Sequence, residues 1–113
     1  MAYDLIERIQ ETSALLNTAV RLLKKRGMEY AGAERDYKIA LNKKILLERE
    51  KGTPVTIISD ICRGSEVIAQ LRFKRDCSEV VYKSAQEAIN SYKLQLRLLD
   101  AQLDREWSHA ARD

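Results

Sequence analysis

The sequence is poor in residues that interrupt or end helices. Its 113 residues include only four glycines and one proline, and seven residues are aromatic. Few helix breakers, combined with 33% charged residues, favour long helices over sheets with many turns. We therefore predict an all-α protein, and its length fits a single domain over residues 1–113.

The sequence also lacks the patterns that mark common catalytic and metal sites. It has one histidine, His109, and its two cysteines, Cys62 and Cys77, show no CxxC spacing. It contains no glycine-rich phosphate loop and no Glu-x-x-His pair of the kind that holds metals inside helical bundles. We therefore expect no enzyme, no metal site and no cofactor.

Long hydrophobic runs are absent as well. No apolar stretch approaches the roughly 20 residues that span a membrane. The N-terminal stretch MAYDLIERIQ carries charges within its apolar pattern, unlike a signal peptide. The two cysteines suit a reducing compartment, although pairing of Cys62 with Cys77 stays open. The expected location is the cytoplasm, without a membrane partner.

Two long segments show helical periodicity instead. Between residues 3 and 50, apolar or small residues recur mostly at steps of three and four, at Ile9, Leu16, Val20, Leu23, Gly27, Tyr30, Ala33, Tyr37, Leu41 and Ile45. Between residues 65 and 109 the steps alternate strictly between three and four, at Tyr82, Ala85, Ile89, Tyr92, Leu96, Leu99 and Leu103. This heptad spacing is typical of coiled-coil packing. Gly27 and Gly32 leave two interpretations of the first segment, of which we prefer a continuous helix to a bent one.

The stretch KGTPVTIISDICRGSE, residues 51–66, separates the two long segments. Gly52 is a suitable residue to end the first helix. Thr53 can cap a new helix that has Pro54 in its first position. This pattern predicts a short helix over residues 54–63.

The short helix is expected to end at Gly64, and Ser65 is a suitable cap for the last helix, residues 65–109. A compact linker between two long helices favours an antiparallel hairpin. The predicted fold is thus a long, coiled-coil-like antiparallel helical hairpin with a short connecting helix.

Further apolar residues lie outside the two stripes, and they suggest a second packing surface. These residues are Leu5, Leu15, Leu22, Ile39, Leu46, Val67, Ile68, Leu71, Phe73, Val81, Leu94 and Leu98. We predict that they pack between chains in a homo-oligomeric helical bundle. The alternative is a monomeric bundle in which a bent first helix folds back on itself.

Positive charge gathers in the middle of the chain. Residues 21–51 carry ten basic and five acidic residues and residues 52–75 carry four and two, whereas both ends are net negative. An antiparallel hairpin would bring the middle segments together near the connector. The candidate anion-binding residues there are Lys44, Asp60, Arg63, Arg72, Lys74 and Arg75. The alternative is a solvated surface with local salt bridges.

Asp60 and Arg63 are the most specific pair in this set. They are spaced i, i+3 on the predicted short helix, so their side chains can touch. One interpretation is that Asp60 orients Arg63 toward a pocket at the mouth of the hairpin, where Gly64 lets another group approach closely. The other interpretation is an ordinary surface ion pair beside a buried helix face.

The connector PVTIISDICRG and the following LRFKRD belong to a longer stretch, residues 20–107, that resembles small proteins of tailed phages and prophages of Gram-positive bacteria. The resemblance carries no catalytic activity and no site residue with it. It implies a location in the cytoplasm of a bacterial host cell. It also implies a modulating role, such as binding nucleic acid or inhibiting a host defence system.

Three functional hypotheses follow from the sequence. The first is an oligomer that binds an anionic small ligand of the nucleotide type and so sequesters a signal used in host defence. The second is a nucleic-acid-binding accessory protein of phage recombination or replication that uses RLLKKR, residues 21–26, on phosphates. The third is a helical scaffold or inhibitor that binds another protein through its second apolar stripe.

Overall fold

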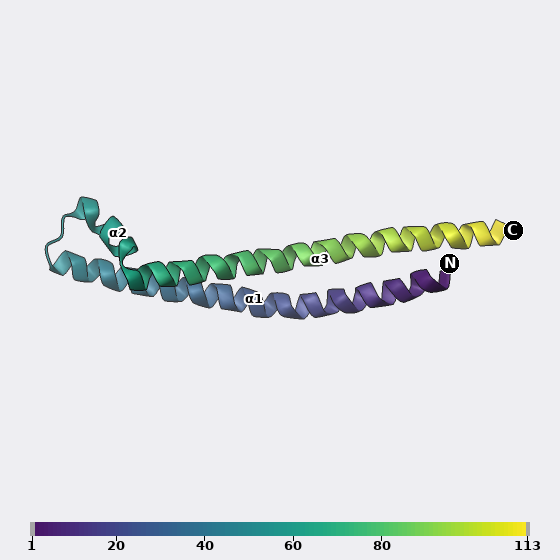
Figure 1. The fold of residues 1–113 in the computed structure, drawn as a ribbon, viewed down its shortest axis with the longest axis horizontal. Coiled ribbons are helices and arrows are strands. Elements are labelled where there is room, and N and C mark those ends of the chain that lie inside the picture. The colour runs from purple at the N-terminus through teal and green to yellow at the C-terminus, as the bar shows by residue number, and fades with distance from the viewer. Residues whose placement is uncertain (1, 113) are drawn as a thin grey trace. The chain divides into compact units, whose positions relative to one another are not determined.

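The computed structural model describes residues 2–112, and it is all-α over this range. Three helices follow one another along the chain: α1 (Ala2–Glu50), α2 (Val55–Gly64) and α3 (Glu66–Arg112) (Figure 1). Their bounds lie close to the predicted ranges 3–50, 54–63 and 65–109. The prediction of an all-α protein is therefore confirmed.

Helix α1 runs without interruption through Gly27 and Gly32, so the continuous interpretation of the first segment is confirmed. At Gly27 the missing side chain leaves room for a neighbour, because a Cβ added there would lie 3.2 Å from Cε1 of Tyr82 on α3. Gly32 has no such constraint, since the nearest atom to an added Cβ is Arg35 Nη2 at 3.9 Å. One glycine thus allows close helix packing, while the other only weakens the helix slightly.

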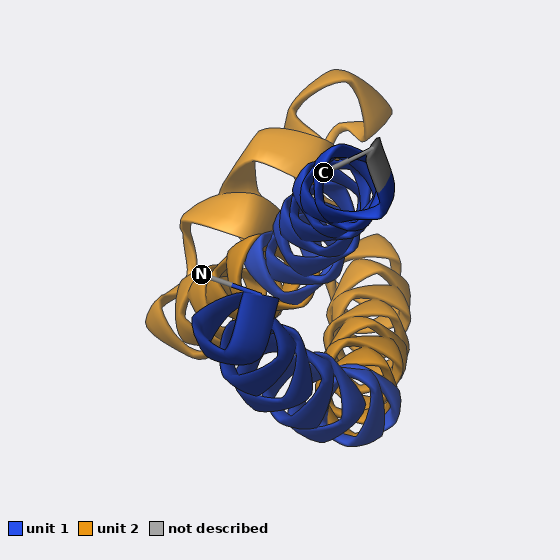
Figure 2. Ribbon diagram, turned by 90° about the vertical axis from the view of Figure 1, so that its right-hand side faces the viewer, with its two compact units in different colours: residues 1–24, 83–113 blue, residues 25–82 orange. Residues whose placement is uncertain are grey.

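The chain divides into two compact units, each built from one part of α1 and one part of α3. Unit 1 combines residues 1–24 with residues 83–113, and unit 2 comprises residues 25–82, including α2 (Figure 2). Within each unit the two helical segments run antiparallel. The antiparallel pairing of the two long helices therefore holds inside each unit.

On α3 the core of unit 1 follows the predicted heptads, whereas on α1 its two buried residues lie outside the predicted stripe. Leu5 and Thr12 on α1 and Ile89 and Leu99 on α3 are buried. On α3, every residue of the predicted seam from Ala85 to Leu103 is buried or half-buried, as expected for coiled-coil packing. Val20 is an exception on α1, since it is half exposed and Ala19 takes the inner position instead. The reason is the strict heptad step from Leu16 to Ala19 to Leu23.

The core of unit 2 is built around aromatic and small residues. Tyr30 and Tyr82 face each other with ring centroids 6.0 Å apart, next to Gly27. Tyr37 is buried beneath Arg75, whose guanidinium carbon lies 4.7 Å from the ring centroid. Helix α2 adds Ile58 and Cys62 to this core, and both are buried.

The predicted second apolar stripe is only partly exposed. Leu5 and Ile68 are buried and Leu71 is half-buried, so these three belong to the cores, contrary to the prediction. Their spacing explains this, because all three extend the heptads of the two helices by further steps of three or four. The other nine residues of that set are 42–68% exposed.

The connector begins with a hydrogen-bonded C-terminal motif of α1. Gly52 has φ of +81°, its N–H donates to Arg49 O over 3.0 Å, and the N–H of Thr53 donates to Glu48 O over 3.1 Å. These two bonds form a Schellman motif, which ends the helix as predicted. The prediction that Thr53 caps α2 is wrong, because its hydroxyl donates to the Glu48 side chain and Pro54 occupies the cap position.

The end of the connector matches the prediction. Helix α2 ends at Gly64, and the N–H of Ile68 donates to Ser65 Oγ over 3.4 Å. Ser65 has extended backbone angles, φ −68° and ψ 143°, which suit a residue that caps the next helix. The chain therefore passes from α2 to α3 through one residue.

Candidate functional site

The positive charge of the chain belongs to unit 2. Residues 25–82 contain twelve basic and nine acidic residues, whereas the rest of the chain contains eight of each. All six predicted anion-binding residues lie in this unit: Lys44 on α1, Asp60 and Arg63 on α2, and Arg72, Lys74 and Arg75 on α3. Unit 2 is therefore the part of the chain whose charge favours an anionic ligand.

Neither of the two hollows described in unit 2 gathers these six residues. Arg72 and Lys74 are two positions apart on α3, so they lie on different sides of the helix. Lys44 lines one hollow, and Lys74 lines another that also contains Glu29 and Asp36. A hollow lined by two carboxylates is unfavourable for an anion. The predicted site residues therefore form separate local groups.

Lys44 belongs to a cluster around Glu48 at the end of α1. The Glu48 side chain is only 9% exposed, and Thr53 Oγ1 donates to its Oε2 over 2.8 Å. Lys44 Nζ lies 3.4 Å and Lys51 Nζ 3.5 Å from Glu48 Oε1. Two ammonium groups and one hydroxyl thus satisfy a single carboxylate beside the turn.

This cluster controls the protonation of Glu48. The hydrogen bond from Thr53 lowers the pKa of the Glu48 carboxyl below its ordinary value. Partial burial acts in the opposite direction, while Lys51 and Lys44 add to the lowering of the pKa. Glu48 is therefore a charged group that holds the connector in place. Its ion pair with Lys44 means that this lysine already has a partner within the chain.

Arg75 is also engaged within the protein. Its Nη2 lies 2.8 Å from Asp76 Oδ1, its Nε donates to the same oxygen over 2.9 Å, and its guanidinium covers the Tyr37 ring. The bond to Asp76 raises the pKa of Arg75 above its ordinary value, although partial burial opposes this. An anion would have to compete with Asp76 for this guanidinium. Because the guanidinium also covers Tyr37, Arg75 has a packing role in the structure.

Asp60 and Arg63 are both exposed on α2, and within residues 2–112 they form no ion pair with each other. The expected contact is therefore not made. A short Asp side chain three positions before Arg reaches less far than a Glu side chain does. A Cβ added at Gly64 meets no atom within 4 Å, so no described group approaches that glycine closely either. Among residues 2–112, no carboxylate is therefore paired with Arg63.

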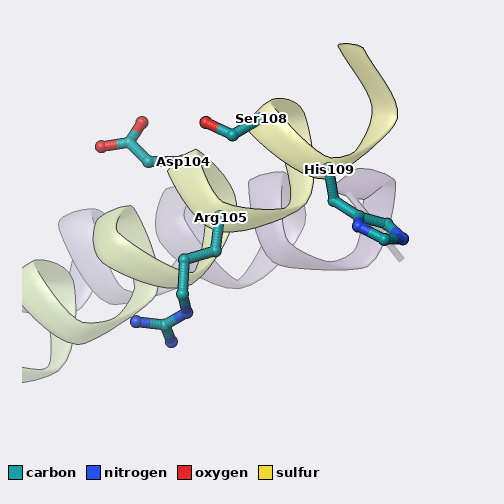
Figure 3. Close-up of a pocket in the computed structure, with 4 residues that line it drawn as sticks. All are labelled: Asp104, Arg105, Ser108 and His109. Atoms are coloured by element: carbon teal, nitrogen blue, oxygen red, sulfur yellow. The ribbon is translucent and has the colours of Figure 1, made fainter. Parts of the chain in front are cut away.

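His109 lies near the end of α3, in unit 1. It lines a shallow hollow with Asp104, Arg105 and Ser108, all from α3 itself (Figure 3). Asp104 and Ser108 extend from one side of the helix, and Arg105 and His109 extend from the other (Figure 3). Within residues 2–112, no cluster of three or more His, Cys, Asp and Glu side chains has a geometry suited to a metal ion.

The two cysteines are free thiols in different surroundings. Cys62 is fully buried on α2, whereas Cys77 is exposed on α3. Over the described part of the chain, no helix combines the length and the apolar content needed to cross a membrane.

Sequence reasoning missed the Glu48 cluster as a unit. The spacing of three residues indicates this cluster. Glu48 lies four residues before Gly52, and its carbonyl is the one that accepts the longer hydrogen bond of a Schellman motif. Thr53 directly follows that glycine. A carboxylate at that position can meet a hydroxyl just beyond the turn.

Comparison with known proteins adds no relationship: no family model matches the chain, and neither a curated protein nor a solved structure is similar to it.

Proposed function

We propose that this chain is a non-enzymatic helical protein that works by assembling with further copies of itself through the outer faces of its helices. The observation that carries the proposal is the surface that one copy leaves exposed. The accessible surface of the chain is 8492 Å². A monomeric protein of 13.0 kDa typically exposes about 6,300 Å². Association would cover the excess.

Large apolar side chains contribute to this surface on all three helices. Tyr3 on α1 is 79% exposed, Val55 on α2 is 80% exposed and Val67 on α3 is 68% exposed. Single exposed apolar residues need no explanation, but rows of them on amphipathic helices are typical of surfaces that pack against other helices. This supports assembly as the function, with the helices as the contacting elements.

The proposal is tested by size-exclusion chromatography with light scattering on the whole chain. We expect a mass of at least twice 13.0 kDa, and a melting temperature that rises with protein concentration because association stabilises the folded state. A mass of 13.0 kDa at micromolar concentration, with a melting temperature that does not depend on concentration, would contradict the proposal.

A second candidate function is binding of an anionic ligand by unit 2. The observation that favours it is the group of basic residues of unit 2 that form no ion pair within residues 2–112, namely Lys25, Lys43, Arg49, Arg63, Arg72 and Lys74. A guanidinium that is not already paired can bind a phosphate with two parallel hydrogen bonds. Together with the resemblance to phage proteins, this supports a ligand of the nucleotide type.

This candidate is tested by thermal denaturation with nucleotides and cyclic dinucleotides. We expect a ligand-dependent rise in melting temperature that Arg63→Ala abolishes and that Arg105→Ala, in unit 1, leaves intact. A rise of the same size in the Arg63→Ala variant would remove Arg63 from the site. A salt-dependent shift with DNA instead would favour the nucleic-acid hypothesis.

A further inference from the structure

The end of α1 and the start of α3 form an apolar hollow in unit 2, which we call the connector hollow. Its volume is about 360 Å³, within the range of about 300–1,000 Å³ that is typical of binding pockets. Its apolar lining consists of Ala40 and Leu47 on α1 and Val67 and Ile68 on α3. Ile68 is buried, whereas Leu47 is 52% and Val67 is 68% exposed. The hollow therefore presents two large aliphatic side chains to water.

Three charged side chains also line the connector hollow, and they determine which partner it favours. Lys44 already pairs with Glu48, its Nζ lying 3.4 Å from Oε1. Glu66 lies in the first turn of α3, where the helix dipole stabilises a carboxylate. Lys43 is exposed and forms no ion pair within residues 2–112. A fitting partner therefore combines an apolar side chain with a carboxylate for Lys43.

The first turns of α1, in unit 1, carry a surface of this kind, which we call the N-terminal face. It consists of Tyr3, Ile6, Glu7 and Gln10, whose spacing of i, i+3, i+4 and i+7 places them on one side of the helix. All four are exposed, Tyr3 to 79% and Ile6 to 39%. Among residues 2–112, Glu7 forms no ion pair. The N-terminal face thus combines an aromatic ring, an aliphatic side chain and a carboxylate that is open to a partner.

We infer that the N-terminal face of one copy docks in the connector hollow of a second copy, with Tyr3 against Leu47 and Val67 and with Glu7 beside Lys43. This inference rests on the proposed self-assembly and names the two surfaces that meet. Each surface lies within one compact unit. Tyrosines seated in apolar pockets are among the residues that contribute most to binding. Because the two surfaces differ, each copy can offer one and accept the other.

Charge favours this pairing over contacts between like surfaces. Residues 1–20 carry three acidic residues and one basic residue, whereas unit 2 carries twelve basic and nine acidic residues. Two N-terminal faces in contact would bring their carboxylates together, and two connector hollows would bring their lysines together. A contact between the N-terminal face and the connector hollow joins opposite charges instead.

Trp107 is a second exposed aromatic residue of unit 1, 60% exposed on α3. The helical repeat places Asp100 and Asp104 on its side of the helix. Ile6 extends the apolar surface beside Tyr3, whereas carboxylates flank Trp107. An apolar hollow therefore favours Tyr3, and Trp107 provides a matched control.

The inference is tested by mixing two variants of the whole chain. Tyr3→Asp disrupts the N-terminal face and Val67→Asp disrupts the connector hollow, and both side chains are exposed, so the helices should persist in circular dichroism. In light scattering we expect each variant alone to remain at 13.0 kDa. An equimolar mixture should reach twice 13.0 kDa, because the face of the Val67→Asp chain fits the hollow of the Tyr3→Asp chain.

Trp107→Asp should associate as the unmodified chain does. The inference is overturned if the mixture stays at 13.0 kDa, or if either single variant keeps the mass of the unmodified chain. Loss of association in Trp107→Asp alone would likewise overturn it, because the docking residue would then be on α3.

Reversal of the two charges gives an independent measurement. Glu7→Lys and Lys43→Glu should each raise the concentration needed for association by about tenfold, and the double variant should restore it. Glu87→Lys in unit 1 and Lys25→Glu in unit 2 change the net charge equally but lie outside both surfaces, so they should have little effect. Equal effects in these controls, or no restoration in the double variant, would exclude the contact between Glu7 and Lys43.

The mass of the unmodified chain separates this inference from the proposed function. If the unmodified chain is oligomeric but Tyr3→Asp and Val67→Asp associate equally well, the interface lies elsewhere, while self-assembly stands. If the unmodified chain is monomeric, both the inference and the proposed function fail.

Discussion

Gly52 and Gly64 look alike in the sequence, since each closes a helix, but the structure assigns them different roles. Gly52 has φ of +81°, in the left-handed region that residues with a Cβ rarely adopt. Gly64 is the last residue of α2 and has no positive φ, and a Cβ there meets no atom within 4 Å. Only Gly52 is therefore required by its backbone conformation.

A first prediction compares alanine at these two positions. Gly52→Ala should lower the free energy of unfolding by about 1–2 kcal/mol, because alanine strains the left-handed conformation. Gly64→Ala should leave the free energy of unfolding unchanged or raise it by up to about 1 kcal/mol, because alanine favours the helix. Urea denaturation at one fixed protein concentration measures both values. Equal effects of the two substitutions would contradict this account of Gly52.

At the scale of the element, the end of α1 depends on a side-chain contact as well as on backbone hydrogen bonds. The Schellman motif fixes the turn, and the Thr53 hydroxyl then holds the Glu48 carboxylate at 2.8 Å. Glu48 therefore links the last turn of α1 to the first residue beyond Gly52. Because its pKa is lowered in the folded protein, this link makes the stability of the connector depend on pH.

A second prediction follows from the direction of that pKa shift. A carboxyl whose pKa is lowered on folding adds stability at pH values above its unfolded pKa. That stability is lost as the pH falls through the lower folded pKa. Thr53→Val removes the main cause of the lowering, so the pKa of Glu48 should rise toward its ordinary value. The variant should melt at a lower temperature than the parent at pH 7, and the difference should shrink at pH 3.

Thr56→Val is the matched control, because Thr56 is an exposed threonine on α2 outside the cluster. Its pH dependence should equal that of the parent. A carboxyl titration followed by NMR gives the pKa of Glu48 directly. If Thr53→Val melts with the same pH dependence as the parent, the hydrogen bond does not control the Glu48 carboxyl.

The helices themselves could be predicted because their periodicity is local. The seam from Tyr82 to Leu103 repeats without an exception, so burial of one face follows from the sequence. The pattern in α1 is weaker, since it includes alanines, glycines and polar residues. It predicts Val20 on the packed face, where the structure has Ala19 instead. The cap of α2 could not be predicted for a different reason. Thr53 has two possible hydrogen-bond partners, and only the folded turn brings Glu48 within reach.

At the scale of the whole chain, composition predicted the all-α class and the gathering of basic residues in the middle segments. Composition did not predict that the candidate anion-binding residues lie in separate local groups. Arg75 is bound by its neighbour Asp76 and by Tyr37, and Lys44 is bound by Glu48 one turn away. Such local partners follow from exact helical positions. A net charge counted over a segment carries no information about them.

The packing of Tyr82 and Arg75 in unit 2 also bears on whether its two helices can slide past each other. A uniform seam of leucines could move by one heptad with little loss of contact. Here a slip in one direction would place Arg75 beside Lys44, where two cations would meet. A slip in the other direction would move Tyr82 away from Gly27, whose missing Cβ leaves room for the Tyr82 ring. Gly27 and Tyr37 thus fix the register of the two helices of unit 2. A force applied along the helix axes should therefore meet high resistance until these contacts break.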